Sequence, residues 1–325
     1  MLATSHTGTG IALWDLATKT IRVEFPLGES SLSENVYEAA FDRQGHWFAA
    51  ASAKIESPEL KGVTVFDVTG RNDPISLDRQ NGTVSNLRFS DDGTRLKLVN
   101  WNGVPTSANF TNRDFREFEV VTGKQLTTRP IAIPQPQWSK VRISLDQKTM
   151  VVVDLSGRSL TIWDTETGRV TASLADSTVS DSRVESVFIS PESATVAVCK
   201  IDGAIDLWEI TTRRLRATLR GHSPRSIPFR VNFSADPNVL ISEGKEHLSP
   251  SPAAQFVESA LRQVRSSKIF YADRLETIVW DLKTGKVRVL LPDRVQAVVS
   301  EDGTRLAATG VGNYPMIRVY DLTKP

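Results

Sequence analysis

The chain has 325 residues, 40% hydrophobic and 24% charged, which is the composition of a folded globular protein rather than a disordered one. A net charge of +1 supplies no overall field to attract nucleic acid or an anionic membrane. No apolar run approaches the roughly 18 residues of a membrane span, and residues 1–10 lack the features of a signal peptide. We therefore expect a cytoplasmic protein with no membrane or nucleic-acid partner.

A strand–turn–strand pattern recurs along the whole chain. Its clearest copy is Leu160–Leu174, where a β-branched and aromatic strand is followed by Asp164, a turn and an alternating strand. Asp164 can cap the turn, and Gly168 can take the left-handed φ that a hairpin bulge needs. In each copy an aromatic residue precedes an acid. The copies are Ile11–Phe25, Val63–Leu77, Phe115–Leu126, Leu160–Leu174, Ile205–Leu219, Thr277–Leu291 and the shorter Ile317–Pro325.

A second hairpin lies between successive copies of the first. It consists of a strand, a turn of the Ser-x-Asp-Gly kind and an apolar strand. Two hairpins give four antiparallel strands per repeat, and units of this kind pack face to face as the blades of a β-propeller. The second hairpins are Val36–Ser52, Val84–Asn100, Val141–Asp154, Val184–Lys200, Phe229–Gly244 and Val295–Gly310.

These motifs resemble the WD-repeat propeller family over essentially the whole chain. The Trp–Asp dipeptide is literal at 14–15, 163–164 and 280–281, and the family's Gly–His dipeptide occurs at Gly221–His222. The Ser-x-Asp-Gly turns look like those of bacterial members. The resemblance implies that His222 bonds within its own blade. Because Gly–His is not repeated from blade to blade, the resemblance does not imply the family's Asp–His–Ser/Thr–Trp network in every blade.

We predict one all-β domain over residues 1–325, a seven-bladed propeller whose first and last blades are incomplete. An alternative is six complete blades closed by Thr20–Phe25, with Ile11–Leu16 as an extra strand. The chain could also be a fragment of a longer protein, in which case a targeting segment could lie outside it. Cys199, the one cysteine, lies in the apolar run Thr195–Cys199, so we expect a buried thiol rather than a nucleophile.

The long connections are expected on one face, here called the top, where second strands lead to third strands. The largest, Lys245–Glu276, contains a predicted helix with Ser251 as N-cap and Pro252 in its first turn. Long loops on a rigid scaffold favour binding. The residues we predict to bind a partner, mostly from these connections, are Trp101, Asn102, Phe110, Arg225, Glu246, His247, Tyr271, Arg274 and Tyr314.

Three functional hypotheses remain open at this stage. The WD-repeat resemblance implies a non-catalytic scaffold that binds a protein or peptide, and no catalytic, metal-binding or cofactor motif is found. A propeller enzyme would need titratable groups at the top of the channel, with Glu246, His247, Tyr271 and Arg274 as the nearest candidates. The third hypothesis is a sensor or docking domain of a larger bacterial protein. The basic run Thr211–Arg230 is interpreted as a solvated sheet edge.

Overall fold

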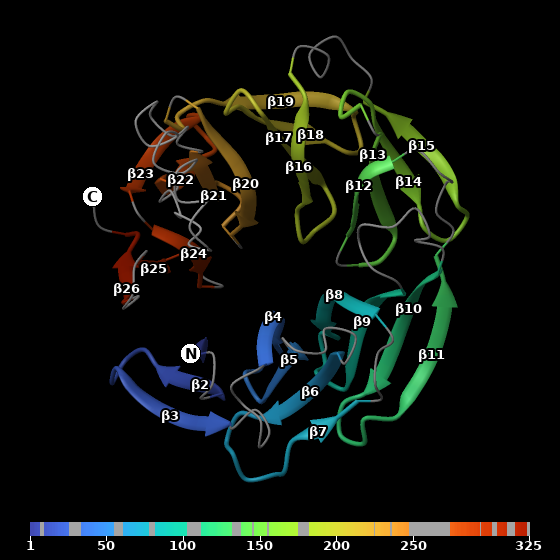
Figure 1. Cartoon of the computed structure of the whole chain (residues 1–325), viewed down its shortest axis with the longest axis vertical. Helices are drawn as coiled ribbons and strands as arrows, with labels where there is room; N and C mark the ends of the chain where they lie inside the picture. Colours follow the sequence, from blue (N-terminus) through green and yellow to red (C-terminus); the bar gives the residue numbers. More distant parts are fainter. Residues whose placement is uncertain are drawn as a thin grey trace, which may run out of the picture. The chain divides into compact units, whose positions relative to one another are not determined.

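The computed structural model describes most of the chain, which forms seven antiparallel sheets of three or four strands (Figure 1). In every sheet the strands pair in the order of the sequence. The described residues are 1–6, 10–25, 34–54, 61–77, 82–102, 112–131, 138–144, 146–154, 156–174, 182–223, 225–234, 236–246, 274–292, 294–300, 304–310 and 316–323.

These sheets confirm the predicted fold class, a seven-bladed β-propeller with three strands in the first and last blades. The six-blade alternative is wrong, because residues 10–15 are the middle strand of the first sheet rather than an extra strand. The predicted helix in Lys245–Glu276 lies outside the described residues.

The strands group into two compact units. The first unit covers residues 1–136 together with 165–168. It holds the first three sheets, whose strands are β1 (Leu2–His6), β2 (Gly10–Asp15) and β3 (Thr20–Phe25); β4 (Glu34–Phe41), β5 (Trp47–Lys54), β6 (Lys61–Asp67) and β7 (Ile75–Ser76); and β8 (Gly82–Phe89), β9 (Arg95–Asn102), β10 (Asn112–Glu119) and β11 (Gln125–Pro130).

The second unit covers residues 137–164 and 169–325 and holds the other four sheets. Their strands are β12 (Trp138–Ile143), β13 (Thr149–Asp154), β14 (Leu160–Asp164) and β15 (Arg169–Ser173); β16 (Val184–Ile189), β17 (Thr195–Lys200), β18 (Ile205–Glu209) and β19 (Arg214–Leu219); β20 (Ser226–Phe233), β21 (Val239–Glu246), β22 (Arg274–Asp281) and β23 (Lys286–Pro292); and β24 (Arg294–Val299), β25 (Arg305–Gly310) and β26 (Ile317–Asp321).

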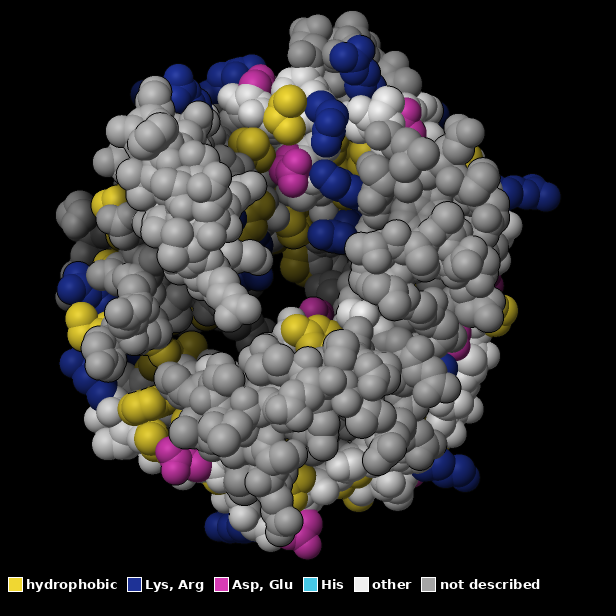
Figure 2. All heavy atoms as spheres, in the orientation of Figure 1, with side chains coloured by type: hydrophobic (Ala, Val, Ile, Leu, Met, Phe, Trp, Pro, Cys, Tyr) yellow, Lys and Arg dark blue, Asp and Glu magenta, His cyan; other side chains and the backbone are white. Residues whose placement is uncertain are grey.

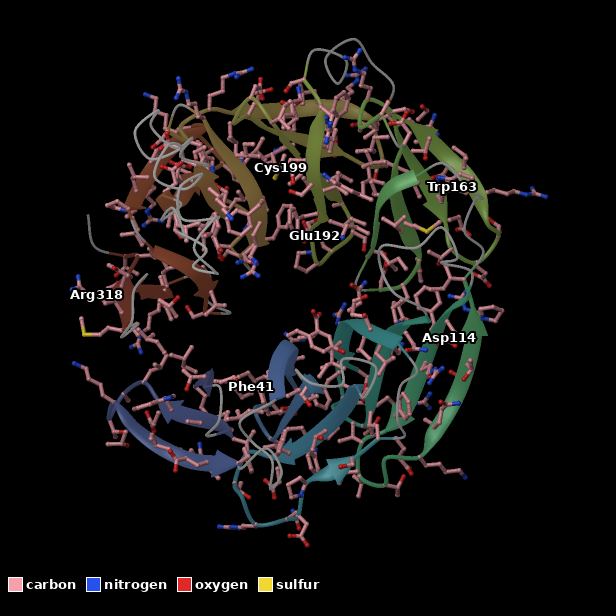
Figure 3. The ribbon with its side chains drawn as sticks, viewed as in Figure 1. Phe41, Asp114, Trp163, Glu192, Cys199 and Arg318 are labelled. Atoms are coloured by element: carbon pink, nitrogen blue, oxygen red, sulfur yellow. The ribbon has the colours of Figure 1, made fainter. Side chains whose placement is uncertain are left out.

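Apolar side chains from facing sheets form the core of each unit. In the first unit Phe118 of β10 shares a cluster with Val65 of β6, and in the second Trp280 of β22 shares one with Leu207 of β18. A middle sheet therefore buries both of its faces, which explains why every residue of a strand such as β17 is buried. Cys199, labelled in Figure 3, is fully buried in β17, and burial raises the pKa of its thiol to about 12. The expectation of a buried thiol is confirmed.

A bulge recurs beside the aromatic residue of the third strand. Register shifts precede Trp14, Phe118, Trp163, Trp208 and Trp280 where each pairs with the outermost strand. The turn that follows contains a residue of positive φ, near 65–70° at the glycines 70, 123, 168 and 285 and 59° at residues 19 and 213. The left-handed conformation predicted for Gly168 is confirmed, and in two of the described turns without glycine Lys19 and Arg213 take this conformation.

The acids after these aromatics cap the turns, as predicted. Asp15, Asp67 and Asp281 each accept a hydrogen bond of 2.8 Å from the backbone N–H two residues later, and Asp321 accepts one of 3.0 Å. Backbone hydrogen bonds lower the pKa of Asp15 and of Asp281. These carboxylates are therefore occupied in holding the fold, and they do not form an acid–base pair.

Candidate partner-binding site

Three of the predicted binding residues lie at one end of the sheet β20–β23. Arg225 directly precedes β20, whose first residue, Ser226, pairs with Glu246. Glu246 in turn pairs with Arg274, the first residue of β22. This end of the sheet carries the longest connection, residues 247–273. The side chain of Arg225 is exposed and that of Glu246 half-buried.

The remaining predicted residues are not brought to this site. Trp101 and Asn102 are the last residues of β9 in the first unit, where they pair with residues 112 and 113 of β10. The structure does not describe the side chains of Trp101 and Asn102. Phe110, His247, Tyr271 and Tyr314 lie outside the described residues, and so does the side chain of Arg274.

A hollow of about 180 Å³ opens at the same end of the sheet β20–β23. Its wall combines two carboxylates, two hydroxyls and an apolar edge. Leu290 of that edge is 48% exposed, so a partner side chain could bury apolar area against it. The lining residues are Ser223, Ser226, Glu246, Leu275, Glu276, Leu290 and Pro292.

The floor of the hollow is fixed by a hydrogen-bond network centred on His222. Its Nδ1 lies 2.7 Å from Oε1 of Glu276 and its Nε2 lies 2.7 Å from Oγ of Ser242. Nε1 of Trp280 donates to the same Oγ at 2.8 Å. Because an ionised carboxylate only accepts, Nδ1 carries a proton, and Ser242 can donate to Nε2 while it accepts from the indole. His222 therefore bonds within its own sheet, as the resemblance implies.

Ser223 completes the coordination of the Glu276 carboxylate. Its backbone N–H donates to Oε1 at 2.9 Å and its hydroxyl donates to Oε2 at 2.6 Å. Burial opposes ionisation of Glu276, but the hydrogen bonds from His222 and Ser223 outweigh it and lower its pKa to about 2. The carboxylate is thus a fixed negative charge at neutral pH.

Close approach of His222 requires Gly244 on the adjacent strand. A Cβ at residue 244 would overlap Nδ1 of His222 and would lie 2.5 Å from Oγ of Ser226. The glycine is needed for space, since its backbone lies outside the positive-φ region. We did not predict the roles of Glu276, Ser242 and Gly244. A signal was present in the sequence, because Glu276 lies four residues before Trp280 and follows the Gly221–His222 dipeptide.

Partial versions of the network occur in two other sheets. Nε1 of Trp14 donates to Oγ1 of Thr4 at 2.9 Å, and Nε1 of Trp163 donates to Oγ1 of Thr161 at 2.8 Å. Across the described part of the chain, the histidine–carboxylate pair accompanies the tryptophan only in β20–β23. This agrees with the expectation that the network is not repeated in each blade.

The basic run 211–230 behaves mainly as an exposed sheet edge. Arg214 and Arg216 are exposed on the outermost strand β19, which agrees with the predicted solvated edge. Nη1 of Arg220 lies 3.4 Å from Oδ2 of Asp202, and Nη1 of Arg230 lies 3.8 Å from Oε2 of the buried Glu243. Two of these arginines are therefore paired with acids instead of being presented to a polyanion.

The scan of protein-family models and the search of curated proteins both found no match for this chain. Within the described ranges, no cluster of His, Cys, Asp and Glu has the geometry to hold a metal ion. A helix with the length and hydropathy needed to cross a bilayer is likewise absent from the part of the chain that the structure describes.

Proposed function

We propose that the chain is a non-catalytic scaffold that binds a protein or peptide at the end of the sheet β20–β23. The observation that carries the proposal is the hollow of about 180 Å³, with charged, hydroxyl and apolar walls, beside the longest connection of the chain. Such a wall suits a peptide, whose side chains alternate between apolar contacts and hydrogen bonds. The resemblance to WD-repeat propellers, many of which are interaction platforms, supports the same function.

The chemistry of the shifted titratable groups also favours binding over catalysis. Glu276 is held by His222 and Ser223, and Asp92 has its pKa lowered to about 2 by Ser90 and Thr94 in a hairpin turn. In both cases the hydrogen bonds that shift the pKa tie the carboxylate to its own sheet. A general acid or base instead needs a pKa near the working pH and a free path to substrate.

Affinity capture with tagged protein tests the proposal. The partners of the wild type are compared with those of Arg225→Ala, Glu246→Ala and a variant in which residues 247–273 are replaced by Gly-Ser-Gly. The matched control is Lys283→Ala with Lys286→Ala, because both lysines line a hollow at the opposite end of the same sheet. We expect the first three variants to lose a partner that the control retains. Full retention by all three, with their fold intact, would exclude this end of the sheet as the binding site.

A further inference from the structure

Three cations gather on the innermost strands of the second unit. Lys140 and Arg142 lie two residues apart on β12, so their side chains project from the same face of the strand. Arg183 directly precedes β16, and the first strands β12 and β16 contact each other. Figure 2 shows Lys and Arg side chains gathered beside one acidic side chain over this region. We infer that this cluster, Lys140, Arg142 and Arg183, binds an acidic segment of the partner.

The electrostatics show that the three cations act on one another. Burial lowers the pKa of Lys140, and the positive charges of Arg183 and Arg142 lower it further. Glu185 opposes this effect, with Oε2 lying 3.7 Å from the Lys140 Nζ. Among the described residues no ion pair joins Arg183 to a carboxylate. A carboxylate supplied from outside would be attracted by the three cations and would relieve their repulsion.

The side chains of Arg142 and Lys140 are held in place before any ligand arrives. The guanidinium of Arg142 lies 5.5 Å from the ring centroid of Phe188, and its Nη1 donates to the carbonyl of Val141 at 3.1 Å. The Lys140 Nζ donates a hydrogen bond of 3.3 Å to the backbone carbonyl of Val184. The carbonyl of Arg183 accepts from Ile201 at 3.0 Å, which fixes its backbone. Preorganised charges lose less conformational entropy on binding than free surface side chains do.

The size of the cluster favours a carboxylate-bearing peptide over a nucleic acid. A nucleic acid presents a phosphate at every nucleotide and is bound through a long basic track. Arg230 on the next innermost strand, β20, does not extend the cluster, because it lies 3.8 Å from Glu243. The net charge of +1 adds no long-range attraction. The patch thus suits one or two carboxylates, whereas a polyanion would find few further contacts.

Fluorescence anisotropy with a fluorescein-labelled hexaglutamate peptide tests the inference, and a labelled single-stranded oligonucleotide provides the second arm. Arg142→Gln and Arg183→Gln each remove one charge, and Arg216→Gln on the exposed outer strand is the matched control. Circular dichroism establishes that every variant is folded. We expect each cluster variant to bind the peptide about tenfold more weakly and the control to bind it as the wild type does.

Two results would overturn the inference: equal peptide binding by wild type and both cluster variants, or tighter binding of the oligonucleotide than of the peptide. The inference depends on the proposed scaffold function, but the two can fail separately. Loss of partner capture in Glu246→Ala, with peptide binding unaffected by Arg142→Gln and Arg183→Gln, would leave the scaffold proposal standing and remove the acidic-segment proposal. Charge-dependent peptide binding, with partner capture retained by Arg225→Ala, Glu246→Ala and the replacement of residues 247–273, would exclude the end of the sheet β20–β23 as the binding site and leave the acidic-segment proposal standing.

Discussion

Replacing Glu276 by glutamine should destabilise the second unit at neutral pH. The Glu276 side chain is 9% exposed, and its carboxylate is bound by His222 and by two donors of Ser223. Lowering its pKa from 4.5 to about 2 corresponds to about 3 kcal/mol of the free energy of unfolding at pH 7. A neutral amide keeps some of these hydrogen bonds but loses the charge, so we expect Glu276→Gln to lower that free energy by about 2–3 kcal/mol.

The same argument fixes how the difference depends on pH. Because the folded pKa of Glu276 lies below the unfolded one, its stabilisation is complete above pH 4.5 and is lost as the pH falls toward 2. The linkage relation leaves about 1.4 kcal/mol at pH 3. The gap in unfolding free energy between the wild type and Glu276→Gln should therefore narrow from neutral pH to pH 3.

Urea denaturation followed by tryptophan fluorescence measures this gap, because Trp280 lies in the same network. Experiments at pH 7, 5 and 3 compare the wild type, Glu276→Gln and the control Glu192→Gln. Glu192 is an exposed residue after β16 and is labelled in Figure 3. The control should match the wild type at each pH. A gap below about 0.5 kcal/mol at pH 7, or one that stays constant down to pH 3, would refute the electrostatic account.

Two further predictions concern packing and charge in the second unit. Gly244→Ala should lower the free energy of unfolding by about 1–3 kcal/mol, whereas Gly62→Ala, with nothing within 4 Å of its new Cβ, should change it little in chemical denaturation. Lys200→Ala should lower the free energy of unfolding by about 3–5 kcal/mol, because it removes the ammonium that lies 2.6 Å from the buried carboxylate of Asp206. The double variant Lys200→Met with Asp206→Leu should recover most of that loss. Equal effects of the two glycine variants, or no recovery in the double variant, would contradict these explanations.

Local patterns in the sequence predicted the hairpins well, because they are governed by local physics. Asp15, Asp67, Asp281 and Asp321 cap the turns that follow their aromatic residues, and Gly168 takes the left-handed φ of 65°. Other predictions depended on long-range packing. Strand β11 extends to Pro130, past the predicted limit at Leu126, and the outermost strand β7 is only Ile75–Ser76. Outermost strands have one pairing partner, so their lengths are weakly specified by alternation.

The candidate site was predicted less completely than the fold. Glu246 was predicted from its place in the longest connection, and Arg225 was named among the binding residues. The sheet register pairs Glu246 with Ser226, the residue after Arg225. Glu276 and Ser242 were missed because the side chain to which both are hydrogen-bonded is distant from them in sequence. His222 is 54 residues from Glu276 and 20 from Ser242. No periodicity in a single strand reveals such a partner.

One strand position shows how the repeat produces different chemistry from the same geometry. In the sheet β20–β23, Leu240 of β21 pairs with Trp280, and Gly244 lies four residues after Leu240. In the sheet β16–β19, Val196 of β17 pairs with Trp208, and Lys200 lies four residues after Val196. Gly244 and Lys200 therefore occupy equivalent positions.

At the first of these positions the absence of a side chain admits His222, which brings Glu276 and Ser242 into one network. At the second, the lysine itself enters the sheet and forms a buried ion pair with Asp206, whose other oxygen accepts from Thr218 at 2.7 Å. Each sheet must compensate the polar groups that it buries, and neighbouring sheets do so with different residues. The backbone repeat thus stays constant while the sequence motif varies, because the compensating residue can lie on the strand itself, as Lys200 does, or in the segment that precedes the sheet, as His222 does.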